Sequence, residues 1–166
     1  MFHVHSLNAD APAFYAELRE QLDALIGDER DAIANLANAA ALIWHSIPDV
    51  NWTGFYLRRH ETELVLGPFQ GKPACVRIAV GRGVCGTAVQ REASVLVPDV
   101  HAFPGHIACD DASRSELVVP LFHAGRVVGV LDLDSPTVGR FSETDRLGFE
   151  ALMSLLQDRT ALDSVL

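Results

Sequence analysis

The segment ELVVPLFHAGRVVGVLDLDSP, residues 116–136, constrains the fold more than any other part of this sequence. Two runs rich in Val, Leu and Phe flank a short turn that contains glycine, which is typical of an antiparallel β-hairpin. In the second run, strict alternation places Val130, Asp132 and Asp134 on one face of a strand and two leucines on the other. The chain must therefore build a sheet with one apolar face and one face that carries acids.

The length of the hairpin turn decides where Glu116 lies. If residues 123–125 form a three-residue loop, the glycine takes the left-handed position that such loops favour, and Phe122 pairs with Arg126. Counting outward from that pair sets Glu116 opposite Asp132. A two-residue turn would instead send Glu116 to the other face of the sheet. The position of the glycine favours the first register.

Three carboxylates then converge on one patch of the sheet, those of Glu116, Asp132 and Asp134. One interpretation is a solvated face near the end of a strand, where water offsets their repulsion. The other is a site for a small cation such as an ammonium group, which convergent carboxylates can bind. Crowded carboxyl groups often keep one proton, so such a site would also hold a general acid.

The remaining sequence predicts helices at both ends of the chain and strands between them. Apolar residues recur at helical spacing over 12–26, and an alanine-rich helix follows over 29–46 with Asp28 as its candidate cap. Strands are predicted over 50–58, 62–71, 71–80 and 94–100, and a short helix over 81–92. Ser142 and Asp145 predict a capping box that opens the last helix. We therefore expect a single α+β domain over residues 1–166, with an N-terminal arm over 1–10 and a central antiparallel sheet.

Composition limits the partners and the compartment. The 166 residues include 13 basic and 22 acidic side chains, a formal net charge of −9. Nucleic acid binding usually needs a basic face, so this balance argues against it. No apolar run is long enough to cross a membrane and no signal peptide opens the chain, which leads us to expect a cytoplasmic protein. Its three cysteines should be reduced thiols there.

The three cysteines have different surroundings in the sequence. Cys75 follows a Gly-Lys-Pro turn, and Cys85 stands where a helix begins, so that the helix dipole would lower the pKa of its thiol. Cys109 lies in a long polar loop, between His106 and two aspartates. Each cysteine alone could be buried filler, but three together favour redox chemistry. A zinc site built from these cysteines and His106 has suitable ligands but lacks the paired spacing of structural zinc sites.

Two aromatic side chains stand in the polar segment NWTGFY. Trp52 and Tyr56 are four residues apart and so share one face of a strand. Packing in the core is the structural alternative. The neighbouring Asn51 and Thr53 make the strand polar for a core element, which favours a pocket wall that suits a thioether or methyl group.

At this point the motifs carry a resemblance to a family. NWTGFYL, LVLGPFQGKPACVRI, GRGVCGTAV, VPDVHAFPGHIACD, SELVVPLF and GVLDLDSP together resemble the GAF-domain free methionine-(R)-sulfoxide reductases, from about residue 33 to residue 155. The cysteine-bearing segments are the most specific, and all three match. The resemblance implies a six-stranded antiparallel sheet flanked by helices, an enclosed pocket for free methionine sulfoxide, and no metal or organic cofactor.

The resemblance also implies roles for individual residues. Those that match Glu116, Asp132 and Asp134 bind the substrate and assist the chemistry, while those that match Trp52 and Tyr56 line the pocket. It further implies that a cysteine thiolate attacks the sulfoxide, that a sulfenic acid forms and then a disulfide, and that a thioredoxin-type dithiol reduces this disulfide.

We predict that Cys109 is the attacking thiol because it alone directly precedes the acidic patch. Cys75 is the predicted resolving cysteine and Cys85 an alternative one, and Cys85 could also exchange roles with Cys109. A non-catalytic GAF sensor that binds a small regulatory ligand is the alternative function. The apolar N-terminal helices could also pack between two copies of the chain in a homodimer.

Overall fold

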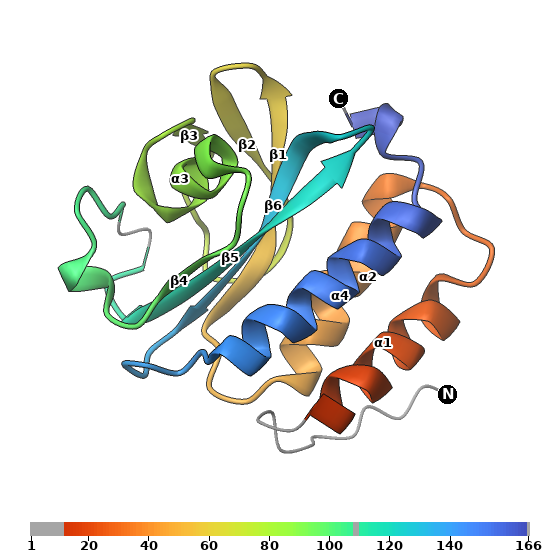
Figure 1. Cartoon of the computed structure of the whole chain (residues 1–166), viewed down its shortest axis with the longest axis horizontal. Coiled ribbons are helices and arrows are strands. Elements are labelled where there is room, and N and C mark those ends of the chain that lie inside the picture. The colour runs from red at the N-terminus through yellow and green to blue at the C-terminus, as the bar shows by residue number, and fades with distance from the viewer. Residues whose placement is uncertain (1–11, 108–109, 166) are drawn as a thin grey trace.

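A computed structural model describes residues 12–107 and 110–165 of the chain. Its centre is a six-stranded antiparallel sheet in the order β3-β2-β1-β6-β5-β4, with helices on both faces (Figure 1). The strands are β1 Trp52–His60, β2 Glu63–Gly71, β3 Arg77–Ala79, β4 Val95–Val97, β5 Ser115–His123 and β6 Arg126–Ser135. The α+β architecture predicted from the sequence is confirmed. No helix within the described ranges is long and apolar enough to cross a membrane.

Two of the helices begin at a residue whose side chain caps them. They are α1 Pro12–Ile26, α2 Ala32–Ser46, α3 Gly83–Arg91 and α4 Glu143–Arg159, with short 3₁₀ helices at Val100–Ala102 and Leu162–Val165. The predicted capping box of Ser142 and Asp145 is confirmed at α4. The predicted cap of α2 is wrong, because Asp31 rather than Asp28 accepts a hydrogen bond from the Ala34 amide, at 2.8 Å. Glu29 binds the amides of residues 30 and 31 and so keeps the chain in a turn for three residues longer.

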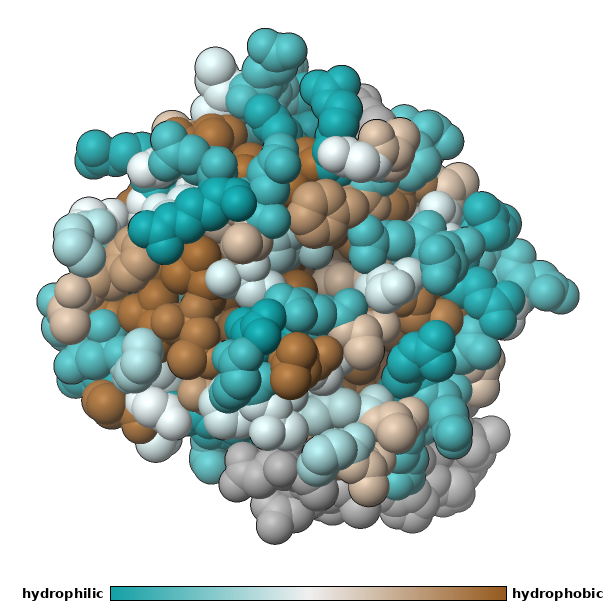
Figure 2. Space-filling view, in the orientation of Figure 1, coloured by the Kyte–Doolittle hydropathy of each residue, from teal (hydrophilic) through white to brown (hydrophobic). Residues whose placement is uncertain are grey.

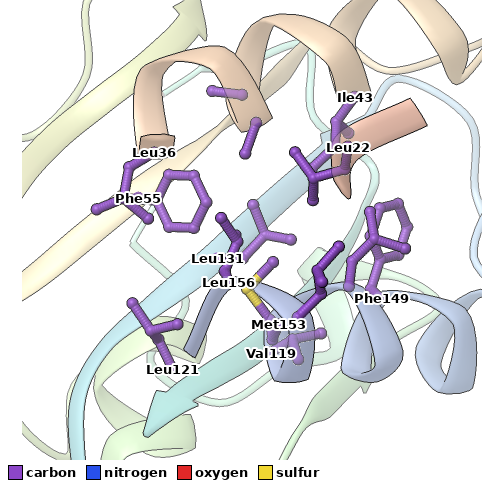
Figure 3. Packing of buried hydrophobic residues seen from close by; sticks show 14 of the residues in the cluster. Leu22, Leu36, Ile43, Phe55, Val119, Leu121, Leu131, Phe149, Met153 and Leu156 are labelled. Atoms are coloured by element: carbon purple, nitrogen blue, oxygen red, sulfur yellow. The ribbon is translucent and has the colours of Figure 1, made fainter. Parts of the chain in front are cut away.

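One face of the sheet packs against α2 and α4, which α1 covers in turn, and this side of the sheet holds the main hydrophobic core. Leu131 and Leu133 of β6 lie on this face, as their alternation with the aspartates predicts. Figure 3 shows how Phe55 and Leu131 of the sheet meet Leu36 of α2 and Leu156 of α4. Burial of these apolar side chains is the main force that holds the three helices on this face.

The other face of the sheet lies under α3 and is less uniformly apolar. A second hydrophobic cluster joins Val84 and Ala88 of α3 to Val118 and Val130 of the sheet. Figure 2 shows that, on the side turned to the viewer, hydrophobic side chains lie mostly in hollows between hydrophilic ones. The face under α3 therefore leaves room for polar groups between the sheet and the helix.

The β5–β6 hairpin differs from the prediction in its turn. Only Ala124 and Gly125 form the turn, and their φ angles of 48° and 74° match a type I′ turn. His123 consequently pairs with Arg126. Without any further irregularity in the strands, this two-residue turn would place Glu116 on the face of the sheet opposite to Asp132 and Asp134.

A β-bulge in β6 restores the face of the acids. Phe122 pairs with Val127 but Leu121 pairs with Gly129, so Val128 is an extra residue in this strand. Beyond the bulge the register is shifted by one residue, which sets Glu116 opposite Asp134 and Asp132 opposite Val118. The predicted pair of Glu116 with Asp132 is therefore wrong, whereas the common face of the three acids is confirmed.

The long loop between β4 and β5 is tied to the sheet at both ends. The Val100 amide donates to the Arg114 carbonyl at 2.9 Å, and the Arg114 amide donates to the Ser135 carbonyl at 2.7 Å. These bonds hold the loop over the end of β6 where the aspartates lie. Cys109 and the predicted N-terminal arm, residues 1–10, fall outside the described residues.

Candidate active site

A cavity lies between the sheet and α3, and it gathers most of the predicted site residues. It contains about 530 Å³ of space free of protein atoms, part of which opens to solvent. From the predicted set, its lining includes Trp52, Tyr56, Cys85, Glu116, Asp132 and Asp134. Cys75 lies in the loop between β2 and β3, and Cys109 lies outside the described residues. Six side chains from four separate elements therefore meet in one place.

The acids form the floor of this cavity. Asp132 lies opposite Gly54 of β1, and Asp134 lies between Trp52 of β1 and Glu116 of β5. The side chains of Asp132 and Glu116 and the Cys85 thiol each place one polar atom within 4.8 Å of the other two. Asp132 Oδ1 is buried and has no hydrogen-bond partner among residues 12–107 and 110–165. The floor therefore offers an unpaired buried acceptor to a ligand.

Burial and mutual repulsion favour the protonated form of these acids. Burial raises the pKa of Asp132, Glu116 and Asp134 well above the ordinary range of a carboxyl group. The second cause is a neighbouring acid in each case: Glu116 for Asp132, Asp134 for Glu116, and Asp132 for Asp134. The cavity can therefore supply a protonated carboxyl at a pH where exposed acids are ionised.

The Cys85 thiol does not behave as its position at the start of α3 predicts. Burial raises its pKa well above the ordinary value, and the negative charges of Asp132 and Glu116 raise it further. Desolvation and two close acids outweigh the dipole of a nine-residue helix. The prediction that the pKa of Cys85 is lowered is therefore wrong, and this free thiol stays protonated.

His106 contacts the acid cluster, which the sequence did not indicate. Its Nε2 lies 3.3 Å from Glu116 Oε2, and both side chains line the cavity. Burial lowers the pKa of His106. A neutral imidazole beside a protonated carboxyl is the arrangement that these shifts favour, and the pair can pass a proton between its members.

The aromatic wall is held by stacking and by hydrogen bonds to a neighbouring loop. The Trp52 ring stacks on Phe69 and on Tyr56, with centroids 5.3 and 5.8 Å apart. Trp52 Nε1 donates to the Lys72 carbonyl at 3.1 Å, and the Tyr56 hydroxyl donates to the Cys75 carbonyl at 2.9 Å. Both side chains thus line the cavity and keep their polar atoms satisfied.

Gly54 lies in this wall directly opposite Asp132. A Cβ atom at this position would lie 2.3 Å from the Phe69 Cβ and 2.8 Å from Trp52 Cη2. Only glycine fits here, because Phe69 and the indole of Trp52 already fill the place of a side chain. Any other residue would displace the indole.

A polar network at the edge of the cavity was also missed by the sequence reasoning. Asn51 Nδ2 donates to Asp110 Oδ2 at 3.3 Å and to Ser113 Oγ at 3.2 Å, and Lys72 Nζ donates to Asp110 Oδ1 at 3.2 Å. These bonds tie the β4–β5 loop to β1 and to the β2–β3 loop. The polar Asn51 before Trp52 was the one available signal, but its partners are distant in sequence.

Cys75 is disulfide-bonded in this structure, whereas Cys85 is a free thiol. A disulfide sulfur is not a thiolate ligand, so the zinc alternative has lost one of its four ligands in this state. Within the described ranges, the cluster with metal-ligand spacing is that of Cys85, Glu116 and Asp132. Cys85 therefore lies as a free thiol beside two acids, whereas Cys75 is part of a disulfide.

Replacing Asp132 with Asn should stabilise the ligand-free protein at neutral pH. A carboxyl group with a raised pKa keeps its proton in the folded chain after the unfolded chain has lost it. Its contribution to the free energy of unfolding is complete below about pH 4 and is lost as the pH rises through the folded pKa. An amide has no such loss, so we expect a melting temperature about 2–4 °C higher at pH 7, equivalent to about 1 kcal/mol.

Thermal unfolding followed by circular dichroism between about pH 4 and pH 8 checks this result. The difference between variant and wild type should shrink toward the acid end, and the exposed substitution Asp28→Asn should show no difference at any pH. A wild type that is as stable as Asp132→Asn at pH 7 would contradict the raised pKa.

Comparison with known proteins agrees with this geometry. The model of the GAF domain matches residues 28–158. Protein YtsP of Bacillus subtilis is 57% identical over 146 residues, which cover 87% of this chain and 90% of that protein. The free methionine-R-sulfoxide reductase of Escherichia coli is 53% identical over 144 residues, 87% of each chain.

A solved structure extends the likeness to three dimensions. The X-ray structure of free methionine-R-sulfoxide reductase from Neisseria meningitidis in complex with its substrate has a TM-score of 0.90 and 48% identity. The match covers 96% of this chain and 95% of that one. The chain therefore belongs to the GAF domain family and, within it, to the free methionine-R-sulfoxide reductases, which are oxidoreductases.

Proposed function

We propose that this protein reduces free methionine-(R)-sulfoxide to methionine. The observation that carries the proposal is the cavity itself, in which two buried acids and one half-buried acid, all of raised pKa, line the same space as two stacked aromatic rings. A relative with 48% identity was solved in complex with its substrate in the same fold. An amino acid whose side chain ends in a methyl sulfoxide matches both the acidic floor and the aromatic wall of this cavity.

Each part of the substrate has a complementary surface. The ammonium group pairs with the acids of the floor, where Asp132 Oδ1 is buried and has no hydrogen-bond partner among the described residues. The S-methyl group lies against Trp52 and Tyr56, because aromatic faces make favourable contacts with sulfur and methyl groups. The carboxylate faces the start of α3, whose first residues, Gly83 and Val84, line the cavity. Free amide groups at a helix N-terminus favour an anion.

The chemistry begins with a thiolate of Cys109, which attacks the sulfoxide sulfur. The sulfur–oxygen bond breaks while Asp132 or Glu116 gives its proton to the oxygen. The hydroxide that leaves, or one from water, then bonds to the Cys109 sulfur, and the bond between the two sulfurs breaks with its electron pair going to methionine. The sulfur of methionine has gained two electrons, and Cys109 has lost two and is left as a sulfenic acid. The ammonium group of the substrate offsets the negative charges around the attacking thiolate.

The cycle closes through a disulfide. The Cys75 thiolate attacks the sulfenic sulfur, and the oxygen leaves with a proton as water. A thioredoxin-type dithiol then reduces this disulfide by exchange. The disulfide-bonded state of Cys75 and the protonated, buried thiol of Cys85 support this division of roles. His106, in contact with Glu116, is placed to return the proton that the acid has lost.

Incubation with three sulfoxides and a dithiol tests the proposal. We expect loss of free methionine-R-sulfoxide and no loss of the S epimer, because the fixed rings and acids accept the oxygen on one side only. A peptide-bound sulfoxide should also be left unchanged, since it has no free ammonium group for the acids. Chiral chromatography of the remaining substrate gives the result. No turnover of any sulfoxide would favour the alternative of a non-catalytic GAF sensor.

The cytoplasmic location and the homodimer stay predictions. A thiol cycle needs a reducing compartment, which supports the first. For the second, Phe14, Leu18 and Leu22 of α1 are buried within the chain itself. Those side chains are therefore not the surface on which a second copy would pack.

A further inference from the structure

The surface around Cys75 combines exposed apolar side chains with positive charge. We name it the Cys75 rim and define it by Lys72, Pro73, Val76, Arg77, Arg82 and Ile107, all of which are exposed. Among the described residues, five large hydrophobic side chains are exposed, and Val76 and Ile107 are two of them. Val76 directly follows the disulfide-bonded cysteine and is 63% exposed. The apolar part of the rim therefore adjoins the disulfide.

The charge of the rim is opposite to that of the whole protein. Residues 71–82 contain three basic residues and no acid, in a chain with a net charge of −9. Lys72 is 69% exposed while its partner Asp110 is 11% exposed. The same holds for Arg77 at 57% and its partner Glu63 at 29%. In both ion pairs the cation is the more exposed member, so the rim presents positive charge to solvent.

The rim also lies at a free edge of the molecule. Cys75 lies between β2 and β3, and β3 is the outermost strand of the sheet, paired with β2 alone. Figure 1 shows α3, which lies beside the edge strand β3, on the opposite side of the sheet from α1 and α4. A partner as large as a protein can therefore approach Cys75 from beyond the edge.

We propose that the Cys75 rim is the docking surface for a protein dithiol, which presents an apolar surface around a reactive thiolate. This inference rests on the proposed function, because the disulfide to be reduced is the product of that reaction. Apolar contact with Val76 gives affinity, and Lys72, Arg77 and Arg82 attract the thiolate and any acidic groups near it. The rim thus favours a protein reductant whose reactive thiolate is surrounded by an apolar surface and by any acidic groups near it.

Docking at the rim places the attack on the sulfur of Cys75. The partner thiolate forms a bond to this sulfur, and the disulfide breaks so that Cys109 leaves as a thiolate. The second thiol of the partner, once deprotonated, then attacks the mixed disulfide and releases the Cys75 thiolate. The partner loses two electrons and ends as a disulfide, and the chain regains both thiols.

The substitution Val76→Asp tests the rim when two reductants are compared. One is thioredoxin, recycled by thioredoxin reductase and NADPH, and the other is dithiothreitol, which needs no docking surface. We expect kcat/KM for thioredoxin to fall about tenfold and the rate with dithiothreitol to stay at the wild-type value. Val138→Asp is the matched control, because Val138 is 59% exposed and lies outside the rim. It should leave both rates unchanged.

Two further measurements separate docking from other causes. Val76→Ser adds no charge next to Cys75 and should still weaken the reaction with thioredoxin alone, whereas Arg82→Glu should weaken it most at low salt. Release of methionine in a single turnover shows that each variant is folded and active. Equal rates of wild type and Val76→Asp with thioredoxin, or equal losses with both reductants, would overturn the docking surface. If the wild type is inactive with both thioredoxin and dithiothreitol, the proposed function itself is wrong.

Discussion

Without reductant, a Cys109→Ser variant should release no methionine, whereas the reduced wild type should release about one equivalent per chain. A serine hydroxyl stays protonated at neutral pH and is a poor nucleophile toward sulfur, so the first bond to the sulfoxide does not form. Amino acid analysis after a single turnover measures this directly. Because Cys109 lies outside the described residues, this experiment is the sharpest test of its proposed role.

The other two cysteines provide matched controls within the same chain. Cys75→Ser should still release one equivalent and then stop as a sulfenic acid, which dimedone traps with a mass increase. Cys85→Ser should release one equivalent and also complete the disulfide, since the raised pKa of Cys85 keeps it out of thiolate chemistry. If Cys109→Ser releases methionine and Cys85→Ser does not, the roles of these two cysteines are exchanged.

Replacing the proton donor should lower kcat by about 10²–10⁴-fold, the usual effect of losing a general acid. The candidates are Asp132 and Glu116, whose pKa values burial raises. In the wild type, the rate should fall as the pH rises through the pKa of the donor, because only the protonated acid can give its proton to the oxygen. Asp132→Asn and Glu116→Gln keep the shape of the side chain and remove the transferable proton.

The pH profile separates the donor from a residue that only binds. In the variant that lacks the true donor, most of kcat should be lost, and the remaining rate should no longer fall as the pH rises. In the other variant, KM should rise more than kcat falls, and the fall in rate at high pH should remain. Glu61→Gln, at an exposed turn far from the cavity lining, is the control that should match the wild type. Wild-type kcat in both cavity variants would show that the proton comes from elsewhere.

The strands and most helices could be predicted because they follow from local patterns. The alternation of Leu131 with Asp132, and the capping box at Ser142, each depend on residues close in sequence. The turn at residues 124–125 could not be predicted in the same way. A type I′ turn and a three-residue loop both accept glycine at position 125, and the bulge at Val128 leaves no trace in the sequence.

The electrostatics of the cavity needed the three-dimensional arrangement. The position of Cys85 at the start of a helix predicts a lowered pKa for its thiol. The fold instead buries this thiol beside Asp132 and Glu116, and its pKa is raised. The contact of His106 with Glu116 was equally invisible, because nine residues separate them in sequence and their distance depends on how the chain between them folds. Long-range contacts of this kind decide protonation, and a single sequence does not contain them.

The raised pKa values of the three acids on the cavity floor have a consequence for calorimetry. The formal charge of −9 counts Glu116, Asp132 and Asp134 as ionised, so it overstates the negative charge of the folded molecule wherever their raised pKa values lie above the solution pH. When the chain melts under those conditions, the three groups discharge their hydrogen ions into the buffer. The transition heat will then differ between phosphate and Tris by the number of hydrogen ions released multiplied by the difference between the ionisation enthalpies of the two buffers.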